Sequence, residues 1–196
     1  MERELKIVIG ILSTWLMYGI YSFFATGDFM VPYVLTPLVI TCCSLLFLIL
    51  NFSIPHRLAL ILFFIGYLAF ALQDDTTLAL LTAATGSYFF QNLADSKAFL
   101  IAGLFVFLLS NGASLMVLHT ESKKRGLTIF CGVIFITSVI FLALGFDVVS
   151  ELLFLVFCFS YFVVCHRINL PDQSASTIVS DLYFLIFALE SFEFLC

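Results

Sequence analysis

The chain has few charged residues and no polar segment long enough to form a soluble domain. Charged residues make up 11% of its 196 residues, whereas hydrophobic residues make up 63%. A typical soluble domain carries about 25% charged residues, so the composition excludes that class. The formal net charge of −5 also argues against nucleic acid as a partner, because phosphate binding needs a basic surface. What the chain does have is a series of long apolar runs, which indicates a membrane protein.

These apolar runs are near 20 residues long and follow one another along the whole chain. That length crosses roughly 30 Å of hydrocarbon at about 1.5 Å per residue of helix. We predict an all-α, polytopic transmembrane helical bundle of about eight spans, with residues 1–196 forming a single integral-membrane domain and no soluble domain. The first span is longer than the apolar part of a signal peptide, so we expect an uncleaved anchor. The predicted spans are Leu5–Ala25, Tyr33–Phe52, Arg57–Gln73, Thr76–Asn92, Lys97–Leu118, Leu127–Phe146, Val148–Cys165 and Ser176–Leu195.

The sequence also lacks the motifs of metal sites and of common hydrolases. Its six cysteines show no CxxC spacing, and it contains neither an HExxH motif nor a phosphate-binding loop. With eight spans, His56 falls on the opposite membrane face from His119 and His166, so three histidines cannot meet at one zinc ion. We therefore expect no metal and no cofactor. His119 and His166 can share a rim with Asp172, or each can simply be solvated at the interface.

The basic residues do not decide the orientation when eight spans are counted. Lys and Arg favour the cytoplasmic side of a membrane protein. The N-terminal side would carry four of them and the opposite side the other four, namely Arg3, Lys6, Arg57 and Lys97 against Lys123, Lys124, Arg125 and Arg167. Either one short span is miscounted, or insertion depends on something other than these charges.

Ionisable side chains inside predicted spans are the best pointers to a site, because burying them in a bilayer costs free energy. Asp181 lies deepest, near Ser180 and Tyr183, whereas Glu151 and Glu190 lie close to the ends of their spans. A hydrogen bond between helices, or a helix start shifted toward solvent, explains Asp181 without a catalytic role.

Polar residues also recur in the fourth and fifth predicted spans. Ser87 with Gln91, and Asn111 with Ser114, are three or four residues apart and share a helical face. Such residues join membrane helices through hydrogen bonds worth about 0.6–2 kcal/mol each, and glycines such as Gly103 allow close approach. Helix packing is the favoured interpretation, and a polar pocket for a lipid headgroup is the alternative.

Three short apolar motifs carry a family resemblance. They are Val34-Leu35-Thr36-Pro37-Leu38, the run from Leu153 to Tyr161, and Asp181-Leu182-Tyr183-Phe184. Through them the whole chain resembles the YhhN family, small eight-span membrane proteins that include lysoplasmalogenases. The resemblance implies a helical membrane fold and, where the activity is retained, cleavage of a vinyl-ether bond in a lipid.

The chain departs from this family at the polar positions. Thr36 stands where the family usually has lysine, and Tyr161 follows Ser160 where the family has the aspartate of a Ser-Asp pair. The family's other key aspartate corresponds to Asp74 by helix count, whereas the local pattern places Ser87 there. Hydrolysis of an ether needs one group to donate a proton and another to activate water, so the loss of either group should strongly reduce activity.

Two functional hypotheses follow. The first is a non-catalytic lipid-binding or accessory subunit of a membrane complex, with membrane lipids and lateral membrane proteins as partners. The second is a lysoplasmalogenase-type hydrolase with Asp74 and Asp181 as catalytic groups. In either case we expect an integral protein of the bacterial inner membrane. The residues expected to line its lipid or polar pocket are Ser87, Asn111, Ser160, Tyr161 and Tyr183.

Overall fold

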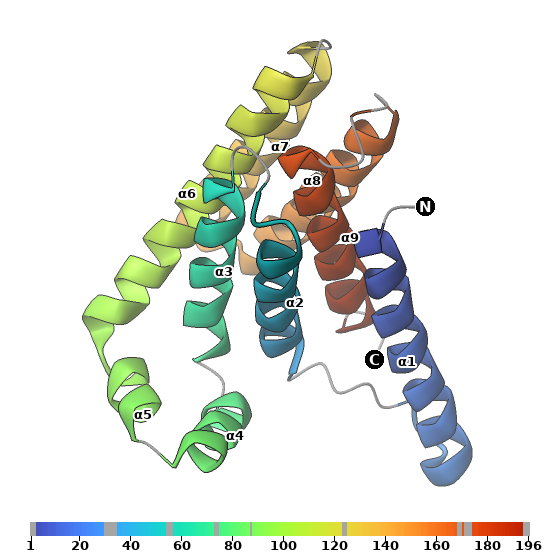
Figure 1. Cartoon of the computed structure of the whole chain (residues 1–196), viewed down its shortest axis with the longest axis vertical. Coiled ribbons are helices and arrows are strands. Elements are labelled where there is room, and N and C mark those ends of the chain that lie inside the picture. Colours follow the sequence, from blue (N-terminus) through green and yellow to red (C-terminus); the bar gives the residue numbers. More distant parts are fainter. Residues whose placement is uncertain are drawn as a thin grey trace. The chain divides into compact units, whose positions relative to one another are not determined.

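The computed structural model describes residues 3–29, 35–53, 57–72, 75–86, 88–122, 125–167, 170 and 174–193, and the regular elements in these ranges are α-helices (Figure 1). The all-α fold is therefore confirmed. The helices are α1 (Arg3–Thr26), α2 (Thr36–Leu50), α3 (Leu58–Ala71), α4 (Asp75–Thr85), α5 (Phe89–Ala94), α6 (Lys97–Glu121), α7 (Arg125–Ala143), α8 (Asp147–Arg167) and α9 (Ala175–Glu193).

Helix length and composition identify an integral membrane protein. In the described part of the chain, five helices are long and apolar enough to cross a membrane: α1, α6, α7, α8 and α9. Two more, α2 and α3, are apolar but shorter, with 15 and 14 residues. Pro37 stands in the first turn of α2, where its missing N–H leaves no helical hydrogen bond unmade.

The segment predicted as a fourth span, Thr76–Asn92, is divided between two short helices. Helix α4 has 11 residues and α5 has six, and Gly86 between them adopts a φ of +63°. This left-handed conformation suits glycine and ends a helix. At about 1.5 Å per residue, α4 reaches roughly half the thickness of the hydrocarbon core. Neither helix alone is long enough to be a span.

The contacts divide the chain into two compact units, of which the second covers residues 32–113. In this unit α2 packs against α3, and α3 packs closely on the first part of α6. A Cβ added to Gly66 would lie 3.1 Å from the backbone of Phe107, and one added to Gly103 would overlap the Cβ of Ala69. The rings of Tyr67 and Phe107 meet edge to face, with centroids 5.6 Å apart. Small residues thus let α3 and α6 approach, as expected of membrane helices.

We expect Gly103→Ala to destabilise the protein while Gly112→Ala on the same helix does not. The added methyl at position 103 would overlap Ala69, and overpacking of this kind costs about 1–3 kcal/mol. At Gly112 an added Cβ meets no described atom within 4 Å. The substitution should therefore gain the better helix propensity of alanine without a steric cost. Thermal unfolding in mild detergent measures both variants. Equal melting temperatures would contradict the close α3–α6 packing.

The first unit covers residues 1–31 and 114–196, and it contains α1, the end of α6, and α7, α8 and α9. Helix α8 packs against both α7 and α9, and α1 runs beside α9 with its N-terminal end in the same direction (Figure 1). Two serines join α7 to α8: Ser138 Oγ donates to the Ser150 carbonyl at 2.8 Å, and Ser150 Oγ donates to the Ser138 carbonyl at 2.9 Å. The first unit holds the charged side chains that are candidates for function.

Candidate functional site

A buried polar cluster lies around the first two turns of α9, in the first unit. Ser174 Oγ accepts the Thr177 N–H at 3.1 Å and shares a 2.6 Å hydrogen bond with the Thr177 hydroxyl. The Ser176 N–H donates to Glu121 Oε2, at the end of α6, at 3.3 Å. The exposed N–H groups of a helix start need such acceptors. The side chains of Ser174, which directly precedes α9, and of Glu121 at the end of α6 therefore cap α9.

Asp181 is the most deeply buried ionisable group of this cluster. Its Oδ1 lies 3.2 Å from Nε2 of His166, at the end of α8. Asp181 has no solvent exposure, whereas the His166 side chain is 30% exposed. Within the described residues, Oδ2 of Asp181 has no hydrogen-bond partner. Burying a carboxyl oxygen without a hydrogen-bond partner costs free energy, so such a group is a candidate functional residue.

A second carboxyl group comes from the start of α1. Glu4 is buried and forms an ion pair with Arg3, with 3.0 Å between Oε1 and Nη2. It also lies close enough to Asp181 to act on it electrostatically. Asp181 and His166 are therefore in contact, and Glu4 lies within electrostatic range of Asp181. Such a group of side chains can donate and accept protons.

Tyr161 and Tyr183 lie in a closed aromatic cluster between α8 and α9. The Tyr161 hydroxyl donates to the Ser114 carbonyl at 2.9 Å, and its ring centroid is 4.8 Å from that of Tyr183. Phe157 completes the cluster, 5.1 Å from Tyr183. Both tyrosines are fully buried. Their surroundings are those of a packed core.

The remaining predicted site residues are dispersed or not described. Asn111 is buried in the second unit, where its Nδ2 donates to the Phe107 carbonyl one turn earlier at 2.8 Å. Ser160 is half-buried on α8. Asp74 and Ser87 lie outside the described residues. The structure therefore brings Tyr161 and Tyr183 together, and it places Asp181 beside His166.

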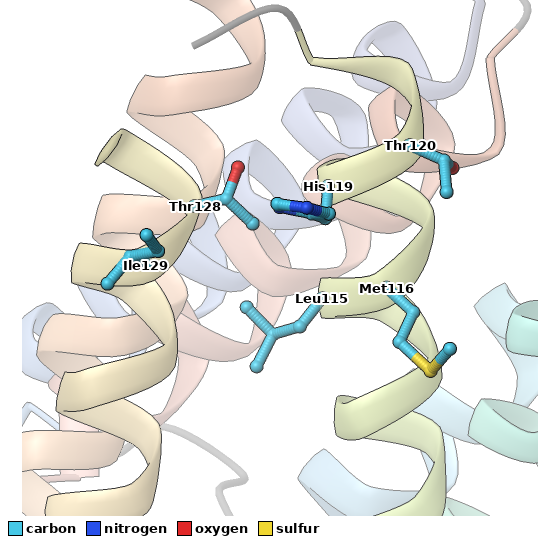
Figure 2. Close-up of a pocket in the computed structure, with 6 residues that line it drawn as sticks. All are labelled: Leu115, Met116, His119, Thr120, Thr128 and Ile129. Carbon is cyan, nitrogen blue, oxygen red and sulfur yellow. The ribbon is translucent and has the colours of Figure 1, made fainter. Parts of the chain in front are cut away.

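A groove of about 280 Å³ lies between the end of α6 and the start of α7. Figure 2 shows His119 of α6 pointing toward Thr128 of α7, and Leu115 of α6 pointing toward the same helix. Thr128 is only 5% exposed, and its Oγ1 has no hydrogen-bond partner in the part of the chain that the structure describes. Met116, Thr120 and Ile129 line the rest of the groove.

The fold and these sites define a polytopic α-helical integral membrane protein. Among the described residues, no three His, Cys, Asp or Glu side chains gather in a way that could hold a metal ion. Comparisons with protein families, with curated proteins and with solved structures find no match to this chain. Inferences about function therefore rest on its own residues.

Proposed function

We propose that the protein is a non-catalytic lipid-binding or accessory subunit of a membrane complex, on a helical scaffold that resembles the YhhN family. The observation that carries this proposal is the burial and hydrogen bonding of Tyr161. It stands where the resemblance expects a catalytic aspartate, and its hydroxyl already donates to the Ser114 carbonyl inside a closed aromatic cluster. Because its hydroxyl is already bonded to a backbone carbonyl within the core, Tyr161 is not placed to act as the missing acid or base.

The outer faces of α7 and α8 support lateral partners. Large apolar side chains are exposed along both helices, where lipid tails or the helices of another protein would contact them. The chain has almost no extramembrane mass, so a protein partner would bind at such faces. We place this subunit in a bacterial inner membrane. The exposed side chains include Ile129, Phe130, Val133, Ile136 and Ile140 on α7 and Val148, Leu152, Val156, Phe159 and Val163 on α8.

Purification from native membranes in mild detergent, followed by mass spectrometry of everything retained, tests the accessory role. We expect at least one membrane protein at constant stoichiometry over successive purification steps. A monomer that retains lipid but no protein would exclude the accessory-subunit hypothesis and leave the lipid-binding hypothesis.

A lysoplasmalogenase-type hydrolase is the second candidate, and the Oδ2 of Asp181, which has no hydrogen-bond partner among the described residues, favours it together with the neighbouring His166. Protonation of the vinyl ether needs an acid, and attack by water needs a base, which this group of side chains can supply. Aldehyde release from a lysoplasmalogen by the purified protein, abolished by Asp181→Asn, would establish it. A wild-type protein with no turnover would exclude it.

The first unit also bears on the number of spans. Glu4 at the start of α1 and Glu121 at the end of α6 both interact with the first two turns of α9. A chain that has both residues at one membrane face crosses the membrane an even number of times between them. We propose that α1, α2, α3 and α6 each cross once and that α4 and α5 do not cross. With α7, α8 and α9 the total is seven spans.

With seven spans, the Lys and Arg residues no longer divide equally between the two membrane faces. The positive-inside preference then assigns the N-terminal side to the cytoplasm. On that side lie seven of the eight Lys and Arg residues, namely Arg3, Lys6, Arg57, Lys123, Lys124, Arg125 and Arg167. Lys97 is the exception, and the opposite side carries eight of the thirteen acidic residues: Asp28, Asp74, Asp75, Asp95, Asp147, Glu151, Glu190 and Glu193.

Topology reporters inserted into the full chain distinguish seven spans from eight. With seven, an alkaline phosphatase inserted after Asp95 is outside and active, and a fluorescent protein inserted after Lys124 is inside and fluorescent. With eight spans and the same N-terminal orientation, both results reverse. An insertion after Asp28 is the control, because both counts place it outside. Fluorescence after Asp95 would overturn the seven-span topology.

A further inference from the structure

Asp181 is a buried carboxyl group with one oxygen that has no partner. The side chain has no exposed surface, and Oδ2 has no hydrogen-bond partner among the described residues. An isolated carboxylate is so costly to bury in apolar surroundings that such a group takes up a proton or acquires a charged partner instead. Without exposed surface, neither water nor a larger ligand can touch Asp181 unless its neighbours move. A proton needs no such space, so it is the ligand that this position can hold.

His166 connects this carboxyl group to water. Its Nε2 lies 3.2 Å from Oδ1 of Asp181, and its side chain is partly exposed, one residue before the end of α8. Asp181 lies six residues after the start of α9, or about 9 Å along the helix. An imidazole that takes up a proton at one ring nitrogen can release one from the other. His166 can therefore carry protons between the membrane surface and Asp181.

The ionisable groups that surround the first two turns of α9 come from three other helices. Arg3 pairs with the neighbouring carboxylate of Glu4 at 3.0 Å, and the Cys165 thiol donates to the Ser176 carbonyl at 3.6 Å. Of these groups, His166 is the one in hydrogen-bond contact with Asp181. The full set is His166 and Cys165 of α8, Arg3 and Glu4 of α1, and Glu121 of α6.

We propose that Asp181 and His166 together form a proton-binding site that is loaded from the membrane face where α8 ends. One proton is held between Nε2 of His166 and the carboxyl group of Asp181, and the pair is neutral whether the proton lies on the imidazole or on the carboxyl group. Loss of this proton leaves a negative charge buried where α9 packs against α1 and α8. Proton occupancy thus links the packing of α9 to the pH at that membrane face. This inference does not rest on the proposed lipid-binding or accessory role.

An NMR titration of the full chain in nanodiscs, with isotopically labelled histidine and aspartate side chains, tests the site. His166→Gln and Asp181→Asn identify the two signals. We expect the ring nitrogens of His166 and the carboxyl carbon of Asp181 to respond over the same pH steps, because they share a proton. Asp181→Asn removes the carboxylate, so it should lower the proton affinity of His166 about tenfold or more. His166→Gln keeps a hydrogen-bond donor, and the Asp181 carbon should then lose the step that it shares with His166.

Asp147→Asn is the matched control, since it makes the same change at the exposed first residue of α8, at the other end of that helix from His166. It should leave the titration of His166 unchanged. If Asp181→Asn failed to fold, the shared step in the wild type and its loss in His166→Gln would still decide the matter. An Asp181 signal that stays constant while His166 titrates, or the same His166 titration in the wild type and in Asp181→Asn, would overturn the proposal. Neither outcome depends on lipid retention, on a protein partner or on turnover of an ether lipid.

Discussion

Replacing Tyr161 with alanine is expected to destabilise the protein by about 3–5 kcal/mol, the cost of removing a large aromatic side chain from a packed core. Tyr161 is fully buried, and its ring packs against Tyr183 and Phe157. The alanine variant leaves a cavity between α8 and α9 and removes the hydrogen bond to the Ser114 carbonyl. Thermal unfolding in mild detergent measures the loss.

Two matched variants separate the contributions of the Tyr161 ring and hydroxyl. Tyr161→Phe removes only the hydroxyl, so it should cost about 0.6–2 kcal/mol, as found for hydrogen bonds between membrane helices. Phe130→Ala removes an aromatic ring that is 55% exposed on α7, and it should have a much smaller effect than Tyr161→Ala. If Tyr161→Ala unfolded at the temperature of Phe130→Ala, the aromatic cluster would not be part of the core, and the main support for a non-catalytic role would fail.

Replacing His166 with alanine is expected to destabilise the protein by about 1–3 kcal/mol, because a buried polar group then loses its partner. Oδ1 of Asp181 interacts with His166, and Oδ2 has no partner among the described residues. The variant would leave both oxygens of a fully buried carboxyl group without a hydrogen bond from α8. The decrease in melting temperature, measured as for Tyr161→Ala, tests this expectation.

Adding Asp181→Asn to His166→Ala should restore about 1 kcal/mol, because a neutral amide costs less to bury than a charged group. His166→Phe is the second control, since it keeps an aromatic ring against Phe162, whose centroid lies 4.4 Å from that of His166. If His166→Phe were as stable as the wild type, the ring contact would account for the effect of His166→Ala. The Asp181–His166 bond would then contribute little to stability.

Much of the fold could be predicted because apolar runs of membrane length leave few alternatives to helices. Seven predicted spans coincide with α1, α2, α3, α6, α7, α8 and α9. The fourth predicted span is the exception, because its helix ends at Gly86, in the middle of the segment. Whether the helix continues through this segment depends on the backbone conformation of one glycine, which amino-acid composition does not predict.

The candidate site was harder to predict because its contacts join distant residues. Asp181 could be singled out as an ionisable residue deep in a span. Its partner His166 was assigned to a rim, since the pairing depends on how α8 and α9 rotate relative to each other. The Tyr161 hydrogen bond to Ser114 joins residues 47 positions apart, and the spacing of residues along a helix does not predict contacts over that distance. Glu4 lies one position before the predicted first span, so a search for ionisable residues inside the spans does not find it.

The cap that Glu121 provides for α9 also has a consequence for the order of assembly. The Ser176 N–H finds this acceptor 55 residues earlier in the chain. Because synthesis runs from the N-terminus, Glu121 and the whole of α7 and α8 are made before the helix that Glu121 caps. The last helix thus completes a contact that earlier helices have left open. A chain that stops before α9 would leave this carboxylate without the Ser176 N–H and would uncover the faces of α1 and α8 that pack against α9.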